Sequence, residues 1–248
     1  MSTDENNKKS SYLRIWDKIK WVPNEKQLDQ FTQLQKFLKE WNQRTNLTRL
    51  LDGDDFWIGQ VGDSLLPLRE ELQYPKLSKK YIDIGSGCGF PGIAIAIAMP
   101  NSNITLLDSS NKKTTFLQEV STKIGLSSRI TVITERAESA GQESIFRGNF
   151  DYAIARAVAP ATVVAEYLVP FLNSNGQALI YKGNWSEIEE QILKKALKAL
   201  NADIQRKDTF FLPNNRGIRN IIRINSINKC PNQYPRSIGK PTKQPLGY

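Results

Sequence analysis

The sequence predicts an α/β fold: a seven-stranded, mostly parallel sheet with helices on both faces and a terminal β-hairpin, preceded by an N-terminal helical cap. Three observations predict it. From Lys80 onward, short β-rich runs alternate with helical runs. The last two β-rich runs have no helix between them, and the residues before Lys80 show the apolar spacing of helices instead. Strand alternating with helix is typical of a parallel sheet covered on both faces.

We assign residues 1–79 to the helical cap. Its main helix is amphipathic, because apolar side chains recur there at three- and four-residue steps. Shorter helices are expected around Tyr12–Ile19 and Asp55–Leu68. The apolar positions of the main helix are Leu28, Phe31, Leu34, Phe37, Leu38 and Trp41.

Residues 80–227 form the predicted sheet domain. The helical runs between its strands are IAIAIA, KTTFLQEVSTKI, AESAGQ, ATVVAEYLVPFL and residues 187–200. The last two strands should pair as an antiparallel hairpin at one edge, since no crossover joins them. In order, the strand candidates are YIDI, ITLLD, RITVIT, FDYAIA, GQALIYK, ADIQRKDTFFL and RNIIRIN.

Residues 228–248 form a basic tail that contains four of the twelve prolines and shows no periodicity, so we expect it to be extended. The net charge of +9 is concentrated near this end: residues 206–248 carry nine basic and one acidic side chain. Such a segment suits a polyanion such as RNA, because neutralised phosphates release counterions. The alternative is a solvated tail that aids solubility.

Composition excludes several classes of protein. The chain has no histidine, which excludes imidazole catalysis, and its two cysteines lack metal-ligand spacing, so no metal site is expected. The polar start has no signal-peptide core, and the longest apolar run, Ile93–Met99, is far shorter than the roughly 20 residues of a membrane helix. We therefore expect a cytoplasmic protein without a membrane partner.

The segment DIGSGCGFPG, residues 83–92, marks the end of a strand, a glycine-rich turn and the start of a helix. Glycine allows positive φ and lets a ligand approach the backbone at the carboxyl edge of a sheet. A dinucleotide fingerprint needs glycine at position 90, where Phe90 stands, and a phosphate-binding loop needs lysine at position 93, where Ile93 stands. The interpretations as a dinucleotide-binding turn and as a phosphate-binding loop therefore both lose support.

The remaining pattern is an acidic residue followed by GxGxG, formed by Asp83, Gly85, Gly87 and Gly89. It suits the amino-acid end of S-adenosylmethionine, whose ammonium and carboxylate can meet Asp83 and backbone groups. Seven strands with a terminal hairpin also match the class I S-adenosylmethionine-dependent methyltransferases, which are Rossmann-like, better than a dehydrogenase. The alternative is a tight turn with a structural role only.

Asp108 strengthens the cofactor interpretation. It ends the second strand, nineteen residues beyond Gly89, where a carboxylate can accept hydrogen bonds from both ribose hydroxyls. Ser109 and Ser110 then cap the next helix. Asp108 as a simple helix cap is the alternative reading.

Two further strand ends complete the candidate site. After the third strand, Ala137 and Glu138 fall where such folds place the adenine edge. After the fourth, Arg156 lies at the carboxyl edge of the sheet, beside the cofactor. An isolated arginine is more often a surface ion-pair partner, so its place at a strand end carries the assignment.

With these residues located, the chain resembles the RsmG family, also called glucose-inhibited division protein B, of bacterial methyltransferases that modify N7 of a guanine in 16S ribosomal RNA. The matching motifs span residues 46–247 and include the internal FPG and the tail rich in proline and basic residues. In order they are NLT, DSLL, DIGSGCGFPG, LLDSSNKKTTFL, RAE, RAVA, KG and YPRSIGKPTKQPLG.

The resemblance implies roles for individual residues. Cofactor contacts are implied for Gly85, Phe90, Asp108, Ser109, Ser110, Ala137, Glu138 and Arg156. RNA contacts are implied for Lys112, Lys113, Lys182, Arg236, Lys240 and Lys243. The chain departs from the family where Gly59 and Gln60 replace a common Arg-His pair, and where Ala155 replaces a common serine.

The implied reaction needs no general base, because N7 of guanine has a free lone pair. This agrees with a chain without histidine, and it makes positioning the catalytic device, with Arg156 as site organiser and not as acid or base. Two other functions stay open: a methyltransferase for a small molecule, and an RNA-binding ribosome assembly factor without catalysis. A dehydrogenase is disfavoured by Phe90.

Overall fold

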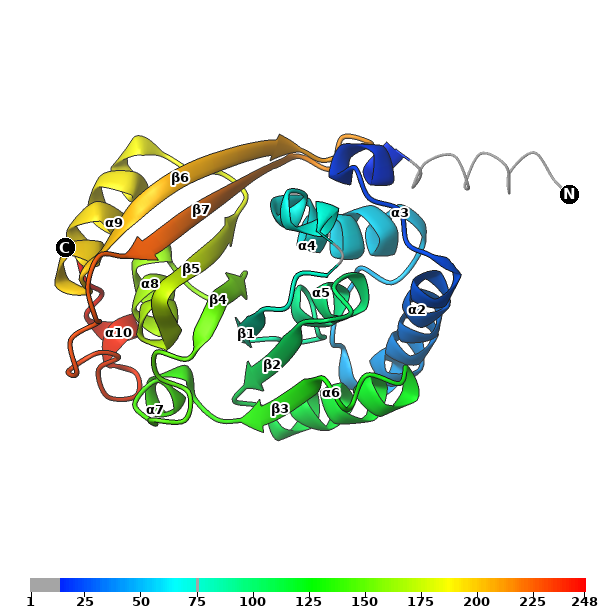
Figure 1. Ribbon diagram of the computed structural model, residues 1–248, viewed down its shortest axis with the longest axis horizontal. Coiled ribbons are helices and arrows are strands. Elements are labelled where there is room, and N and C mark those ends of the chain that lie inside the picture. Colours follow the sequence, from blue (N-terminus) through cyan, green and yellow to red (C-terminus); the bar gives the residue numbers. More distant parts are fainter. Residues whose placement is uncertain (1–13, 75) are drawn as a thin grey trace, which may run out of the picture.

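A seven-stranded sheet forms the centre of the protein (Figure 1), as seen in a computed structural model that describes residues 14–74 and 76–248. All seven predicted strands are confirmed, in the order β3-β2-β1-β4-β5-β7-β6. Their bounds are β1 (Lys80–Ile84), β2 (Asn103–Asp108), β3 (Ile130–Thr134), β4 (Phe150–Arg156), β5 (Leu172–Lys182), β6 (Ala202–Phe211) and β7 (Ile218–Ser226).

The strand order defines where a ligand can bind. Strands β1 to β5 are parallel, and the chain runs outward from β1 to β2 and β3 before it returns to β4 on the other side of β1. Parallel sheets bind ligands outside the carboxyl ends of the strands at such a reversal. The predicted hairpin is confirmed: β7 pairs antiparallel with both β5 and β6, so β6 is the edge strand at this end of the sheet.

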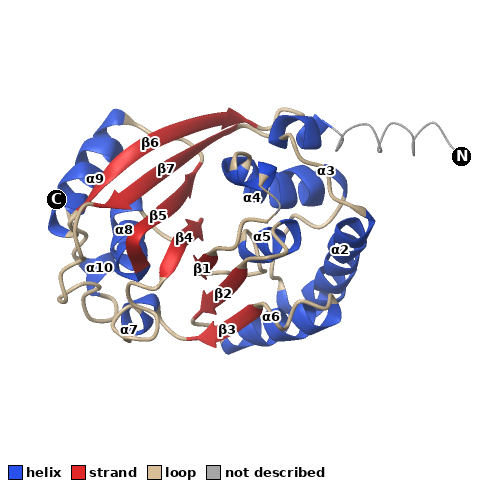
Figure 2. Cartoon of the chain, viewed as in Figure 1, coloured by secondary structure: helices blue, strands red, loops and turns tan. Residues whose placement is uncertain are grey.

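Helices cover both faces of the sheet (Figure 2) because successive strand residues point to opposite sides. On β1, Tyr81 belongs to one apolar cluster and Ile82 to the other. The first cluster includes α5 (Gly92–Ala98) and α6 (Asn111–Lys123). The second includes α7 (Ala137–Ala140), α8 (Ala161–Leu168) and α9 (Glu187–Ala199). The helices expected between the strands are thus confirmed.

The N-terminal helices pack on the α5–α6 face. Residues 14–19 are helical, and the part of the expected first helix before Arg14 lies outside the described residues. The amphipathic helix is α2 (Glu25–Thr45), which begins with a capping box between Asn24 and Gln27. The third expected helix is confirmed as a continuous run of α3 (Gly53–Phe56), a π-helical turn η1 (Trp57–Gly62), α4 (Asp63–Leu65) and a 3₁₀ turn η2 (Leu66–Leu68).

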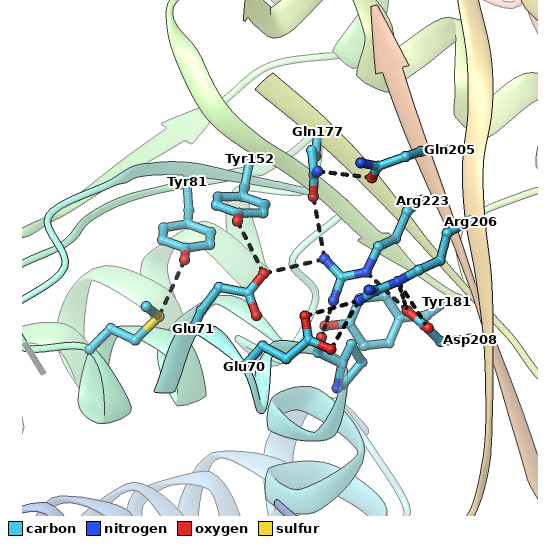
Figure 3. A network of polar contacts seen from close by, with 12 residues as sticks. Glu70, Glu71, Tyr81, Tyr152, Gln177, Tyr181, Gln205, Arg206, Asp208 and Arg223 are labelled. Atoms are coloured by element: carbon cyan, nitrogen blue, oxygen red, sulfur yellow. Dashed lines mark hydrogen bonds and ion pairs between the residues drawn. The ribbon is translucent and has the colours of Figure 1, made fainter. Parts of the chain in front are cut away.

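A buried arginine ties this N-terminal region to the far end of the sheet (Figure 3). Arg223 on β7 donates from Nη1 to Glu71 Oε1 at 3.3 Å and from Nε to Asp208 Oδ2 at 3.0 Å. It also donates to the carbonyl oxygen of Pro67, and Tyr152 donates to the same Glu71 oxygen. The helical cap and the sheet are therefore joined by polar contacts as well as by a shared apolar core.

The C-terminal segment, residues 228–248, is docked on the α7–α8–α9 face, so the prediction of an extended tail is wrong. The guanidinium of Arg147 donates to the carbonyl oxygens of Cys230, Pro231 and Tyr234. A short helix, α10 (Lys240–Lys243), contacts α8. Proline and the lack of periodicity indicated an irregular backbone correctly, but the groups that hold it come from distant parts of the chain.

Candidate functional site

The glycine turn lies between β1 and α5. Gly85, Gly87 and Gly89 all adopt positive φ, at 71°, 57° and 90°, which is the reason the sequence needs glycine there. The start of α5 is held by Asp83, whose Oδ2 accepts from the backbone N–H of Gly92 at 2.9 Å. The turn therefore has a fixed shape with backbone open to a ligand.

Two cavities meet at this turn, one of about 670 Å³ and one of about 260 Å³. Both are lined by Gly85, Lys113, Ala157 and Val158. A side chain at Gly85 would come within 2.8 Å of a Val158 methyl group, so only glycine lets Val158 lie over the turn. Ala157 has a φ of 57°, a strained conformation of the kind that clusters at functional sites.

The smaller cavity has a fixed carboxylate on one wall. Asp108 accepts from the N–H of Gly87 at Oδ2 and from the N–H of Ser110 at Oδ1, both at 3.0 Å. Oδ1 keeps a lone pair for a ligand hydroxyl, whereas Oδ2 also pairs with Lys113 Nζ at 3.5 Å. Ser110 is the N-cap residue of α6, as predicted, but in the described part of the chain its side chain makes no capping hydrogen bond.

Glu138 and Tyr167 line the same cavity. Glu138 Oε1 accepts from the Tyr167 hydroxyl at 3.1 Å and from the backbone N–H of Gly239 at 3.0 Å. Burial, together with the nearby Glu138 carboxylate, raises the pKa of Tyr167. The hydroxyl thus stays a donor to Glu138 at neutral pH.

The larger cavity is organised around Arg156. Its Nη1 donates to Asp63 Oδ2 at 3.0 Å and to the carbonyl oxygen of Gly59 at 3.2 Å, and its Nη2 donates to Gln60 Oε1. The guanidinium carbon lies 6.0 Å from the centroid of the Phe90 ring. Arg156 is therefore held between the N-terminal helices and the glycine turn.

Gln60 and Asp63 each bind a second group besides Arg156. Gln60 is buried on the π-helical turn, and its Nε2 also donates to Thr48 Oγ1 at 3.0 Å and approaches Cys88 Sγ at 3.7 Å. Asp63 Oδ1 accepts from Arg219 Nε at 2.8 Å. π-helical turns are frequent at functional sites, which fits the position of Gln60 at the cavity wall.

Asp83 lies beneath the turn with only 1 % of its surface exposed. Its Oδ1 has no hydrogen-bond partner among the described residues. Loss of hydration raises the pKa of this carboxyl to about 7, although the Gly92 N–H and Arg156 oppose the rise. An unpartnered oxygen of this kind is what a cationic group of a ligand would satisfy.

Comparison with known proteins decides the family. The model of the family described as rRNA small subunit methyltransferase G matches residues 27–218. A protein named ribosomal RNA small subunit methyltransferase G from Prochlorococcus marinus (strain NATL2A) is 77 % identical over the full length of both chains. One from Parasynechococcus marenigrum (strain WH8102) is 50 % identical over 94 % of each chain.

This chain belongs to the rRNA small subunit methyltransferase G family. Solved structures at low identity agree on the fold. TrmK from M. capricolum, solved with S-adenosyl-homocysteine, is 16 % identical with a TM-score of 0.50 over 66 % of this chain and 69 % of that one. A branched-chain polyamine synthase from Thermus thermophilus is 13 % identical with a TM-score of 0.53 over 68 % and 56 %. The fold is that of class I S-adenosylmethionine-dependent methyltransferases.

The structure brings most of the cofactor residues expected for this family to the two cavities. Gly85, Gly87, Phe90 and Arg156 line the larger one. Gly85, Asp108, Ser109, Ala137 and Glu138 line the smaller one. Asp83, Gly89 and Ser110 lie behind these walls and line neither cavity.

The residues expected to face RNA separate more widely. Lys113 lines both cavities and Lys182 lines the larger one, whereas Lys112, Lys240 and Lys243 are exposed on the surface. Arg236 is different, because its guanidinium and its backbone N–H donate to the buried Glu166. An RNA contact by the Arg236 guanidinium would compete with that ion pair.

Sequence reasoning missed Gln60, Asp63, Tyr167 and Arg219 as site residues. Asp63 is the first residue of the DSLL motif, and Gln60 is one of the two residues that replace the common Arg-His pair. The sequence therefore singled out both positions, but it indicated no function for either side chain. Tyr167 and Arg219 carried none, because α8 and β7 reach the site only through the fold.

Within the residues that the structure describes, no helix combines the length and apolar character needed to cross a bilayer. The same residues contain no group of three or more His, Cys, Asp or Glu side chains placed to hold a metal ion.

Proposed function

We propose that this protein transfers a methyl group from S-adenosylmethionine to N7 of a guanine in 16S ribosomal RNA. One observation carries the proposal: two cavities join over Gly85, a fixed carboxylate, Asp108, lines the smaller one, and a restrained guanidinium, Arg156, lines the larger one. The smaller cavity suits the adenosine of the cofactor, and the larger one has room for a base that enters from outside.

The residues present fit the cofactor. Asp108 would accept the ribose hydroxyls, and Ala137, Glu138 and Ser109 would border the adenine. The open backbone of Gly85 and Gly87 would meet the methionine end, with Phe90 on the neighbouring wall. Gly89 and Ser110 support these groups from behind, and the unpartnered Oδ1 of Asp83, which lies behind the same walls, would attract the ammonium of the cofactor from beneath the turn.

The chemistry asks for orientation and not for proton transfer. When bound, S-adenosylmethionine supplies an electrophilic methyl group on a sulfonium. Guanine N7 is an acceptor in neutral RNA, so no side chain must remove a proton. Holding two reactants in line can supply on the order of 7–11 kcal/mol of the barrier.

Arg156 contributes by keeping its position. Its Nη1 and Nη2 donate to Gly59, Gln60 and Asp63, so the guanidinium is restrained beside the cavity without offering these donors to N7. A donor on N7 would occupy the lone pair that attacks. We therefore assign Arg156 to organising the site.

On the RNA side we propose Lys112, Lys113, Lys182, Lys240 and Lys243. Lys182 pairs with Glu189 at 3.2 Å and Lys113 with Asp108 at 3.5 Å, and both lysines keep part of their side chains exposed. The Lys182–Glu189 pair is solvent-accessible on both sides and contributes little, so a phosphate can replace it. Lys113 pairs with the buried Asp108 and would reach RNA through the part of its side chain that stays exposed. Arg236 is left out of this set. The substrate is 16S rRNA as free RNA, as a small subunit or as an assembly intermediate, met in the cytoplasm without a membrane.

The division of the chain follows from the same proposal. The helical cap, residues 1–79, contributes Gly59, Gln60 and Asp63, which restrain Arg156. Residues 80–227 would bind the cofactor, and residues 228–248 would present Lys240 and Lys243 to the RNA.

The test is methyl transfer with a labelled donor to unmodified 16S RNA and to small-subunit particles, followed by mapping of the modified base. We expect 7-methylguanine at one position, and Asp108→Asn should lower the initial rate strongly. Asp203→Asn, an exposed aspartate on β6, is the matched control and should leave the rate unchanged. Methylation at a carbon or an exocyclic amine, or label in small molecules only, would contradict the proposal.

A further inference from the structure

The C-terminal segment is fastened beside the smaller cavity by a buried ion pair. Glu166 on α8 is fully buried, with 0 % of its side chain exposed. Its Oε1 accepts from the backbone N–H and Nε of Arg236, both at 2.9 Å, and its Oε2 accepts from Nη2 at 2.7 Å. A two-pronged arginine–carboxylate pair fixes orientation as well as position. Arg236 therefore fixes where the following residues of the segment lie.

Gly239, three residues later, reaches the cavity wall. Its N–H donates to Glu138 Oε1 at 3.0 Å, and its φ of 79° is one that glycine adopts without cost. Arg236 Nη2 also donates to the carbonyl oxygen of Gln244 at 2.8 Å, which closes the segment into a loop around Gly239.

The same Glu138 oxygen is held from a second direction by Tyr167. The Tyr167 hydroxyl donates to Oε1 at 3.1 Å and lies 3.4 Å from Thr242 Oγ1, which also belongs to the C-terminal segment. Glu138 and Tyr167 both line the smaller cavity, together with Asp108. Two donors on one carboxylate oxygen leave this wall little freedom to move.

We infer that the C-terminal segment is part of the cofactor pocket: Arg236, clamped to Glu166, is a positioning residue that sets Glu138 through the Gly239 N–H. The inference rests on the proposed function, which places adenosine in the smaller cavity. It gives Arg236 a role in cofactor binding in place of the RNA contact expected from the sequence.

The test is calorimetric binding of S-adenosylhomocysteine and of adenosine alone to the full-length protein, well below the unfolding temperature. Arg236→Ala should weaken both ligands by about the same factor, about tenfold, because the change lies at the adenosine end. Arg236→Lys keeps a positive charge beside the Glu166 carboxylate and should recover part of the affinity for both ligands. Arg206→Ala removes a half-exposed arginine far from the pocket and should leave both affinities as in the unchanged protein.

Tyr167→Phe covers the case in which Arg236→Ala does not fold. It removes one of the two donors to Glu138 and should weaken both ligands about threefold. In turnover with RNA, Tyr167→Phe should raise the KM for S-adenosylmethionine more than it lowers kcat, which a general loss of stability would not do.

The outcomes separate the two claims. If Arg236→Ala and Tyr167→Phe fold and bind both ligands as tightly as the unchanged protein, the inference is overturned and the proposed function stands. If the unchanged protein itself binds no S-adenosylhomocysteine, the proposed function is overturned, because the pocket then has another ligand.

Discussion

Arg156 and Arg223 connect the sheet to the same stretch of N-terminal helices, but Arg156 lines the larger cavity whereas Arg223 is enclosed by its partners. Arg223 on β7 is enclosed by Glu71, Asp208 and the Pro67 carbonyl, with 4 % of its side chain exposed. Arg156 on β4 has partners of similar kinds, yet 16 % of its side chain stays exposed at the wall of the larger cavity. The comparison separates an arginine that holds the fold from one that holds the fold and also shapes a site.

The largest expected effect is a loss of stability on replacing Arg223, the arginine that holds the fold. Arg223→Met should lower the free energy of unfolding by about 3–5 kcal/mol, because Glu71 and Asp208 lose their buried partner. Urea denaturation measures the loss. Arg206→Ala, an exposed neighbour that also pairs with Asp208, should cost less than about 1 kcal/mol. Equal costs for the two variants would remove the distinction between a buried and an exposed arginine.

Arg156→Lys tests the second arginine of the comparison, the one that also shapes the site. A lysine keeps the charge but carries its donors on one nitrogen, which cannot reproduce the two-nitrogen spread of Arg156 toward Gly59, Gln60 and Asp63, so the site loses its geometry. We expect kcat for RNA methylation to fall about 100-fold, with a smaller loss of stability than in Arg223→Met. Single-turnover methylation and urea denaturation of the same preparation measure both. A stable variant with an unchanged rate would show that Arg156 has no role in the reaction.

The pH dependence of the free energy of unfolding reports the protonation state of Asp83, the buried carboxyl near Arg156. Burial raises the pKa of Asp83 to about 7, so the folded protein keeps a proton there that the unfolded chain has lost by pH 6. Stability from this group is therefore present at pH 6 and is lost as the pH rises through 7, by about 1.4 kcal/mol between pH 6 and pH 8. Asp83→Asn cannot titrate and should lack this decrease.

Urea denaturation of Asp83→Asn and the unchanged protein at pH 6, 7 and 8, without ligand, checks this. The variant should gain stability relative to the unchanged protein as the pH rises. Parallel curves for the two proteins would mean that Asp83 is already charged at pH 6.

The smallest expected effect concerns exposed cations of the C-terminal segment. Lys243→Ala should weaken RNA binding about threefold and lower the slope of log K against log salt by about 1, because one phosphate contact is lost. Lys194→Ala on α9 is the matched control, since Lys194 pairs with Glu190 outside the proposed RNA contacts. The same salt slope in both variants would remove Lys243 from the RNA surface.

Local pattern was enough to predict the sheet and most of its helices. Alternating apolar residues gave each strand a position between two apolar clusters, and the missing crossover before β7 predicted the hairpin. The π-helical turn at Gln60 has no comparable signal, because its geometry depends on packing. The docking of residues 228–248 depends on Glu166 and Arg147, which lie 70 and more than 80 residues away from their partners.

The sequence predicted those residues of the candidate site that lie at or shortly after the ends of strands. Asp108 and Arg156 end strands, Gly85 directly follows one, and Glu138 lies four residues beyond another, so the topology brings them to one edge of the sheet. Gln60, Asp63 and Tyr167 reach the same cavities from helices whose orientation no local pattern defines. The family resemblance, together with the basic charge of the tail, placed Arg236 on the RNA side, and the buried carboxylate that binds it is visible only in the fold.

A crystal structure with S-adenosylhomocysteine tests the central claim most directly. The account predicts adenosine in the smaller cavity with its ribose on Asp108, and the sulfur at the junction over Gly85, facing the larger cavity beside Arg156. A ligand bound elsewhere, or adenosine in the larger cavity, would contradict it.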